Sequence, residues 1–223
     1  MRVVIIFFFF ITLALGQNNS EVRIRNDYSA FNANLSGGWI YNNKVINVQG
    51  SYYLFEDWNT QGIVVTNNDQ NLSLSGLNYD TRTNSLVAKV SEDSLYVFNN
   101  DNIKEIIINR KKFKRYLNTG VQTYFEVVAV SKDIEILKKY EKSLKKGTLN
   151  PLTQQTSPDK YVDDITYFFY DDGKIQELKL AKKSFINMFG EKSEAIKKYI
   201  SKNNVSVKDE RNFQTILNYY NTL

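Results

Sequence analysis

From Gly50 onward the chain consists of short runs in which apolar and polar residues alternate. Small polar residues separate these runs at intervals of roughly eight to twelve positions, as in antiparallel β-proteins. Alternation with a period of two places successive side chains on opposite faces of a strand, and the runs are rich in β-branched and aromatic residues that suit a half-buried sheet. We therefore predict an antiparallel β-meander, as a multi-stranded sheet or an open barrel, over residues 50–144, with strands at 62–66, 71–75, 77–79, 85–90, 94–98, 103–109, 111–117, 124–131 and 134–140.

The alternation stops at residues 145–160, where Gly147, Pro151 and Pro158 stand among Thr, Gln and Ser residues. Glycine and proline interrupt regular structure, so this segment is predicted to be a mobile loop. Beyond it, apolar runs at 164–170 and 174–178 flank Asp171-Asp172-Gly173. Asp-Gly between two apolar runs is a strong hairpin signal. A β-hairpin is therefore expected at the start of the final segment, residues 161–223.

The end of the chain changes from a period of two to helical spacing. Phe213, Ile216, Leu217 and Tyr220 recur three and four positions apart, which gives a helix one apolar face. Helices are predicted at 182–189, 191–202 and 208–221. Four consecutive aromatic residues at 167–170 place two rings on each face of their strand, which indicates a sheet covered on both sides there. The predicted fold class is α+β, with C-terminal helices packed on the sheet.

The first sixteen residues have the pattern of a secretory signal peptide. Arg2 precedes an apolar stretch of 13 residues, at 3–15, whereas a spanning helix needs roughly 20. Small residues at Ala14 and Gly16 fit a cleavage site before Gln17. We expect export to the periplasm or cell surface, with no membrane span after cleavage; the alternative is an uncleaved anchor. The Asn-rich residues 17–49 are predicted to be a flexible leader, with one edge strand at 45–48.

Composition removes several classes of chemistry. The chain has no Cys and no His, which excludes thiol nucleophiles, Cys/His zinc sites, haem ligation by His and every triad with an imidazole base. Carboxylates, Lys, Tyr, Ser and Thr remain, and no catalytic spacing connects them. The sequence therefore predicts no cofactor, no metal site and, more readily than an enzyme, a non-catalytic protein.

Positive charge is concentrated in the second half of the chain. Residues 17–102 hold five Lys/Arg and nine Asp/Glu, whereas residues 103–223 hold 23 and 15. In a strand, Arg110, Lys112 and Lys114 would share one face and form a row of cations for anionic lipid headgroups, acidic glycan or a partner's carboxylates. The alternative is an edge strand that its lysines protect from aggregation. Nucleic acid is not expected as a partner of an exported protein.

Aromatic residues provide the second binding candidate. Tyr52, Tyr53 and Trp58 lie just before the first predicted strand, where exposed rings could stack against a sugar or peptide. Aromatic residues near strand ends also often belong to the core or to a lid over it. Both interpretations stay open at this point.

Five short motifs lie along the predicted elements: GSYYL at 50–54, GIVV at 62–65, LNYD at 77–80, YFF at 167–169 with the turn at Gly173, and LNYYN at 217–221. With these motifs the chain resembles a family of exported proteins common in Bacteroidota, whose members have no assigned activity. The resemblance covers roughly residues 50–223. It implies export and the β-rich fold, and it carries over no active site.

Three functions are compatible with these residues. The first is a non-catalytic binding protein of the cell envelope, holding a protein, glycan or anionic surface by its sheet face or basic edge. The second is a glycan-directed envelope hydrolase that works with carboxylates alone, which needs two carboxyl groups from different strands within about 10 Å in an open cleft. The third is a small carrier of an apolar ligand in a half-open barrel, which needs an empty apolar interior.

Overall fold

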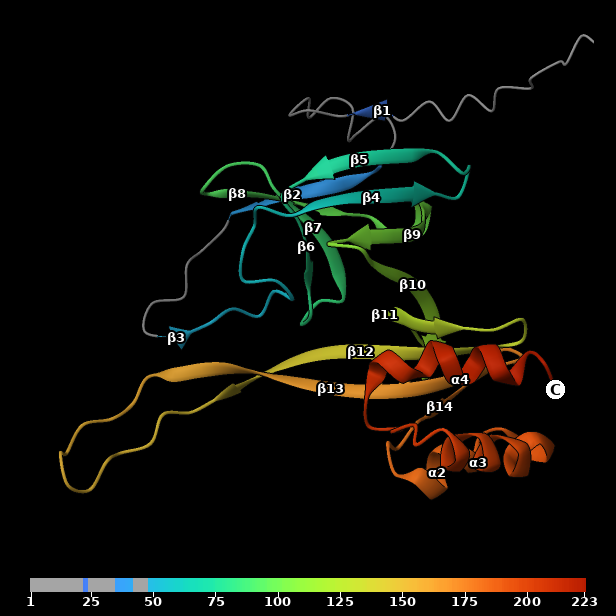
Figure 1. Cartoon of the computed structure of the whole chain (residues 1–223). Helices are drawn as coiled ribbons and strands as arrows, with labels where there is room; N and C mark the ends of the chain where they lie inside the picture. The colour runs from blue at the N-terminus through green and yellow to red at the C-terminus, as the bar shows by residue number, and fades with distance from the viewer. Residues whose placement is uncertain (1–21, 24–34, 42–47) are drawn as a thin grey trace, which may run out of the picture.

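The computed structural model describes residues 22–23, 35–41 and 48–223, which form a large sheet, a small sheet and a set of C-terminal helices (Figure 1). The predicted signal peptide and most of the predicted leader lie outside these residues. Pairing is antiparallel except where β1 meets β5 and β3 meets β13. The α+β class is therefore confirmed. Among the described helices, none combines the length and apolar character needed to cross a membrane.

The large sheet has the order β1-β5-β4-β9-β10-β11-β12-β13-β14, with β3 paired to β13 beside this path. Because the order ends in two different strands, the sheet does not close on itself. Ten strands contribute: β1 (Val22–Arg23), β3 (Val48–Gln49), β4 (Gln61–Thr66), β5 (Asn71–Ser75), β9 (Ile103–Ile108), β10 (Lys111–Asn118), β11 (Val121–Val130), β12 (Ile134–Lys145), β13 (Asp159–Asp171) and β14 (Lys174–Glu177).

The small sheet interrupts the large one along the chain. After β5 the chain turns at Gly76 into β6 (Leu77–Asp80), β7 (Ser85–Lys89) and β8 (Ser94–Phe98), and only then returns as β9 beside β4. The fourth strand, β2 (Gly37–Tyr41), comes from the predicted leader and pairs antiparallel with β8. The prediction of a flexible leader is thus wrong at residues 37–41, because this segment pairs with the otherwise open edge of β8 and places Trp39 edge-on against Tyr96, with ring centroids 5.1 Å apart.

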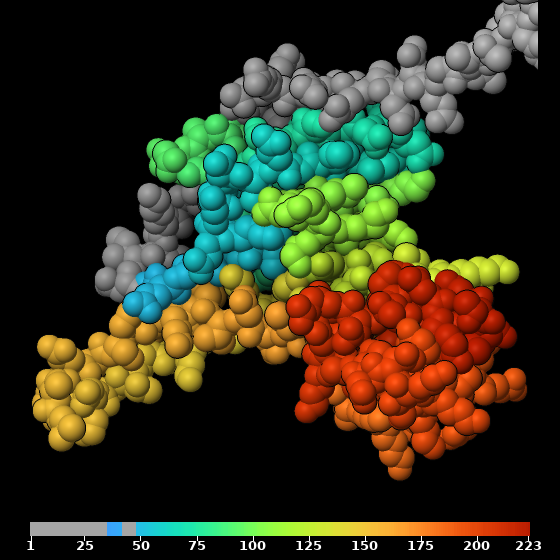
Figure 2. Space-filling model, viewed as in Figure 1, coloured from blue at the N-terminus to red at the C-terminus, as the bar shows by residue number. Residues whose placement is uncertain are grey.

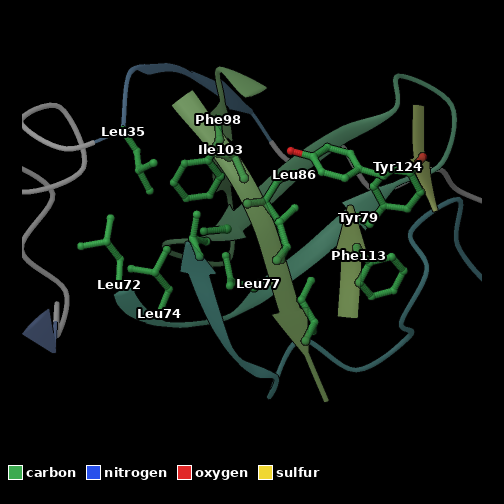
Figure 3. Close-up of a cluster of buried hydrophobic side chains, with 14 of the residues drawn as sticks. Leu35, Leu72, Leu74, Leu77, Tyr79, Leu86, Phe98, Ile103, Phe113 and Tyr124 are labelled. Atoms are coloured by element: carbon green, nitrogen blue, oxygen red, sulfur yellow. The ribbon is translucent and has the colours of Figure 1, made fainter. Parts of the chain in front are cut away.

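One hydrophobic core fills the space between the two sheets. Residues on one face of the small sheet, such as Leu77, Leu86 and Phe98, pack against strands of the large sheet (Figure 3). In the described part of the chain this interior is therefore occupied by side chains, which is the packing expected of two sheets face to face. Its buried members are Leu35, Val64, Leu72, Leu74, Leu77, Tyr79, Leu86, Ala88, Tyr96, Phe98, Ile103, Ile106, Ile108, Phe113 and Tyr124.

A second core joins the helices to the large sheet. The helices are α2 (Lys182–Asn187), α3 (Ser193–Lys202) and α4 (Phe213–Tyr220), with short 3₁₀ turns η2 (Gly190–Lys192) and η3 (Glu210–Asn212) before the last two. Of the four aromatic residues at 167–170, Tyr167 and Phe169 face these helices. Phe168 faces the other side of the sheet, where its ring lies 5.2 Å from that of Phe125. The predicted division of rings between the two faces is confirmed, with helices covering one face and strand side chains lying on the other.

The predicted loop is shorter than expected. Strands β12 and β13 extend into its two ends and form a long hairpin that projects from the body (Figures 1 and 2). Pairing extends as far as Lys145 with Lys160, so residues 146–158 form the connection. The prediction of a loop was wrong at its two ends because polar side chains alternate on this exposed two-stranded arm without an apolar face to indicate a strand.

Candidate functional site

The aromatic candidates lie in a layer that covers the outer face of the small sheet. Tyr53 is only 4% exposed and packs with Val87 and Leu95, which point away from the main core. The Trp58 ring meets that of Tyr53 edge-on at 4.6 Å. Both rings therefore pack against the outer face of the small sheet and cover it.

Hydrogen bonds attach this layer to β6. The amide of Leu54 donates to the carbonyl of Tyr79 at 2.9 Å. The side chain of Asn78 holds Phe55 twice: its Oδ1 accepts from the Phe55 amide at 3.0 Å, and its Nδ2 donates to the Phe55 carbonyl at 2.7 Å. Thr60 donates its hydroxyl to the carbonyl of Leu77. The segment is therefore part of the folded unit rather than a free platform.

Tyr52 is partly exposed, but its ring already has a cation. The guanidinium carbon of Arg82 lies 3.1 Å from the ring centroid, and Arg82 is held by Asp80 at 3.2 Å. The Tyr52 ring also meets Tyr161 of the hairpin arm edge-on at 5.8 Å. Because one face of the ring carries Arg82, Tyr52 links the small sheet to the arm more readily than it offers a stacking surface.

The expected row of cations at Arg110, Lys112 and Lys114 is not formed. Arg110 lies in the turn between β9 and β10, where Asn109 and Arg110 have φ of 50° and 66°. Two consecutive positive φ values are typical of a tight hairpin turn. Strand β10 lies between β9 and β11, so the alternative of a protected edge strand is wrong as well.

The two lysines of that row are paired with carboxylates from other strands of the large sheet. Lys112 pairs with Glu105 at 3.0 Å, and Lys114 pairs with Glu135 at 2.9 Å. Tyr116 donates a further hydrogen bond to Glu135. Glu105 comes from β9 on one side of β10, and Glu135 comes from β12, beyond β11 on the other side, so the positive charge of these lysines is compensated across the sheet.

A polar cluster that the sequence analysis missed lies between the two hydrophobic cores. Glu126 of β11 is 7% exposed and accepts hydrogen bonds from Lys111 at 2.9 Å and from Tyr140. Next to it, Lys138 pairs with Glu210 at 2.7 Å, and Tyr167 donates to the same carboxylate oxygen at 2.6 Å. We call these six residues the junction cluster: Lys111, Glu126, Lys138, Tyr140, Tyr167 and Glu210.

The junction cluster is built as a charge-compensated structural network. Lys138 and Glu126 are opposite each other in the register of β11 and β12, so the two trios are contiguous. Burial and the hydrogen bond to Glu126 raise the pKa of Tyr140 far above its usual value. Burial alone would raise the pKa of Glu210, but hydrogen bonds from Lys138 and Tyr167 more than offset it, so the net shift is downward. Glu210 is thus an ionised acceptor near neutral pH, and Tyr140 and Tyr167 are neutral donors.

This arrangement bears on catalysis and on metal binding. A carboxylate hydrolase needs one carboxyl group free to exchange a proton and another free to attack or activate water. Glu126 and Glu210 each hold an ammonium group and a phenol instead. In the ranges that the structure describes, no group of three or more acidic side chains is placed to hold a metal ion. The sequence feature that could have indicated this cluster is Glu126, a lone carboxylate at a core-facing position of an otherwise apolar strand.

We expect the buried tyrosines to resist alkaline ionisation. Among the described residues, eight tyrosines have a pKa raised mainly by burial: Tyr53, Tyr79, Tyr96, Tyr116, Tyr124, Tyr140, Tyr167 and Tyr220. Because the folded pKa exceeds the unfolded value of about 10, their contribution to stability is complete below pH 10 and is lost as pH rises toward the folded pKa. Tyrosinate absorbance should therefore rise in two steps, the second coinciding with loss of β-sheet circular dichroism. A single step near pH 10 with the fold retained would contradict this burial.

Unpaired positive charge is concentrated on the helices. Residues 179–208 hold eight lysines and two glutamates, a net charge of +6, which exceeds the +5 of the whole chain. Among the described residues, Lys197 alone of these eight has a carboxylate partner, Glu194 at 3.0 Å. A groove of about 470 Å³ runs between α2 and α3 within this segment. We call residues 179–208 the basic helical unit.

Comparison with known proteins gives no further guide. No family model, curated protein or solved structure matches the chain. A function is therefore to be inferred from the side chains of this protein and their geometry.

Proposed function

We propose that the protein is a non-catalytic binding protein of the cell envelope that attaches to an anionic surface through the basic helical unit. The observation that carries this proposal is the net charge of +6 on residues 179–208, combined with a single ion pair there among the described residues. Like charges at this density repel one another, and an anionic partner relieves the repulsion.

The contrast with the rest of the chain supports this choice. Eight of the eleven lysines on the described strands are paired with acids, as in Lys104 with Asp69 and Lys142 with Asp163. Lysines of the basic helical unit have other contacts or point to solvent: Lys182 donates to the hydroxyl of Ser201 at 3.2 Å, and Lys192 lies over the Tyr220 ring at 4.1 Å. The largest group of lysines available to an external anion is therefore located on the helices.

The position of the unit suits attachment to a surface. Helices α2 and α3 lie at the end of the molecule away from the small sheet (Figure 1), so an anionic surface can approach them from the side that faces away from that sheet. Lysines close to an anionic membrane surface contribute about 1 kcal/mol each. The signal-peptide pattern at residues 1–16 supports export to the envelope, where phosphate-bearing surfaces are available.

A non-catalytic role agrees with the side-chain chemistry. The chain offers no thiol and no imidazole, and the two carboxylates of the junction cluster are held by lysine and tyrosine. The sequence-derived candidates at Tyr52, Tyr53 and Trp58 serve packing. Binding through charge is the activity that these groups support best.

Co-sedimentation with lipid vesicles tests the proposal. The purified protein should sediment with vesicles that contain phosphatidylglycerol and stay in solution with pure phosphatidylcholine. Its binding should weaken at least about tenfold between roughly 50 and 300 mM salt, since screening acts on exposed charges. Equal binding to both vesicle types, or binding that is independent of salt, would contradict an electrostatic attachment.

A further inference from the structure

The groove between α2 and α3 has the features of a small-ligand site. Its volume of about 470 Å³ lies within the range of roughly 300–1,000 Å³ that is typical of such sites. Lys182 and Lys183 line it from α2, and Lys197 and Ser201 line it from α3. The ammonium group of Lys182 on α2 donates to the Ser201 hydroxyl on α3 at 3.2 Å. Lys197 of α3 lines the same groove, so both helices place lysines around one space.

The balance of charge in the groove favours an anion with more than one negative charge. Three ammonium groups line it, and its one carboxylate, Glu194, is paired with Lys197 at 3.0 Å. Neither Lys182 nor Lys183 has a carboxylate partner among the described residues. The groove therefore carries two net positive charges.

We infer that this groove binds the phosphate group of a phosphomonoester, an inference that rests on the proposed function and specifies its ligand. A phosphomonoester carries about −1.5 to −2 charges at neutral pH and three strong acceptor oxygens, which matches two uncompensated ammonium groups. A carboxylate brings one charge and leaves the second lysine unmatched. Lysine binds phosphate as a point charge, which does not require the planar fork of arginine.

The groove also has room for the organic part of such a ligand. Ile186, which is buried at 6% exposure, lines the groove beside the lysines and provides an apolar contact. The side-chain amide of Asn187 and the Ser201 hydroxyl can bind further polar atoms. Two sources present this chemistry, namely a lipid with a monoester phosphate headgroup and a soluble phosphorylated metabolite.

The first test is titration of the isotope-labelled protein with inorganic phosphate and with glycerol 3-phosphate at constant ionic strength, followed by amide NMR shifts. Amide signals of α2 and α3 should move in a saturable manner. The double variant Lys182→Gln with Lys183→Gln should bind at least about tenfold more weakly, since it removes two charge-assisted contacts. The matched control, Lys198→Gln with Lys202→Gln, makes the same charge change on α3 outside the groove and should bind within about twofold of the unchanged protein.

Vesicles identify the source of the phosphate. Preference for phosphatidic acid over phosphatidylglycerol at equal surface charge, lost in the Lys182→Gln/Lys183→Gln variant, supports a lipid headgroup in the groove. Saturable binding of glycerol 3-phosphate without that preference supports a soluble ligand in the same groove. Absence of phosphate-induced shifts, or equal weakening in both double variants, overturns the inference. If that inference fails but the protein still binds anionic vesicles in a salt-sensitive manner, the proposed attachment to an anionic surface stands. If vesicle binding is absent as well, both the attachment and the phosphate site are contradicted.

Discussion

Replacing Glu126 by alanine is expected to lower the free energy of unfolding by about 2–4 kcal/mol. Breaking a buried ion pair by removing one partner costs about 3–5 kcal/mol, and the estimate is reduced because the Lys111 side chain is 35% exposed and can regain water. Truncation leaves Lys111 and the Tyr140 hydroxyl without their acceptor. Urea denaturation followed by circular dichroism measures the change.

Two further variants separate the ion pair from the packing. Glu194→Ala removes an exposed pair with Lys197 by the same chemical change and should cost less than about 0.5 kcal/mol. The double variant Lys111→Met with Glu126→Leu should recover most of the loss, because replacing both partners of a buried pair by apolar residues is often neutral. Equal losses for Glu126→Ala and Glu194→Ala would show that the junction cluster is not buried as described.

Replacing Phe213 by alanine is expected to lower the free energy of unfolding by about 3–5 kcal/mol, the usual cost of deleting a buried phenylalanine ring. Phe213 is fully buried, and its ring lies 5.5 Å from that of Phe185 on α2 and 5.7 Å from that of Tyr167 on β13. It therefore joins the basic helical unit to the large sheet. The measurement is urea denaturation with helical circular dichroism as the probe.

The control for this variant is Leu152→Ala, at the end of the hairpin arm, where the side chain is 92% exposed. A change there should stay within about 0.5 kcal/mol. A loss below about 1 kcal/mol for Phe213→Ala would mean that the helices are not held to the sheet by this core.

Local pattern predicted most strands because alternation is a local property. The strands at 71–75 and 94–98 coincide with β5 and β8, and the Asp-Gly signal marks the turn between β13 and β14. The division into two sheets was not predictable in this way, because it depends on which strands pair at long range. The chain leaves the large sheet at Gly76, where φ is +68° and an added Cβ would lie 2.9 Å from the carbonyl oxygen of Lys89. No periodicity indicates that β9 returns beside β4.

The number of basic residues can be counted from the sequence, but the positions at which they remain unpaired depend on the fold. The row at Arg110, Lys112 and Lys114 lies in the densest basic segment, yet Glu105 of β9 and Glu135 of β12 pair with its two lysines. Pairing across a sheet joins residues far apart in sequence, so a count along the chain overestimates free charge on strands. On a helix, a lysine pairs with an acid three or four positions away in the sequence. The excess of lysine over acid at residues 179–208 can therefore be read from the sequence itself.

Vesicle binding by two triple variants of equal charge tests the central claim most directly. One replaces Lys182, Lys183 and Lys198 by glutamine, and the other replaces Arg110, Lys112 and Lys114 by glutamine. If the basic helical unit carries the attachment, the first should bind phosphatidylglycerol vesicles at least about tenfold more weakly, at about 1 kcal/mol per lysine, and the second should bind within about threefold of the unchanged protein. The reverse order, or equal loss in both, would contradict attachment through the helices.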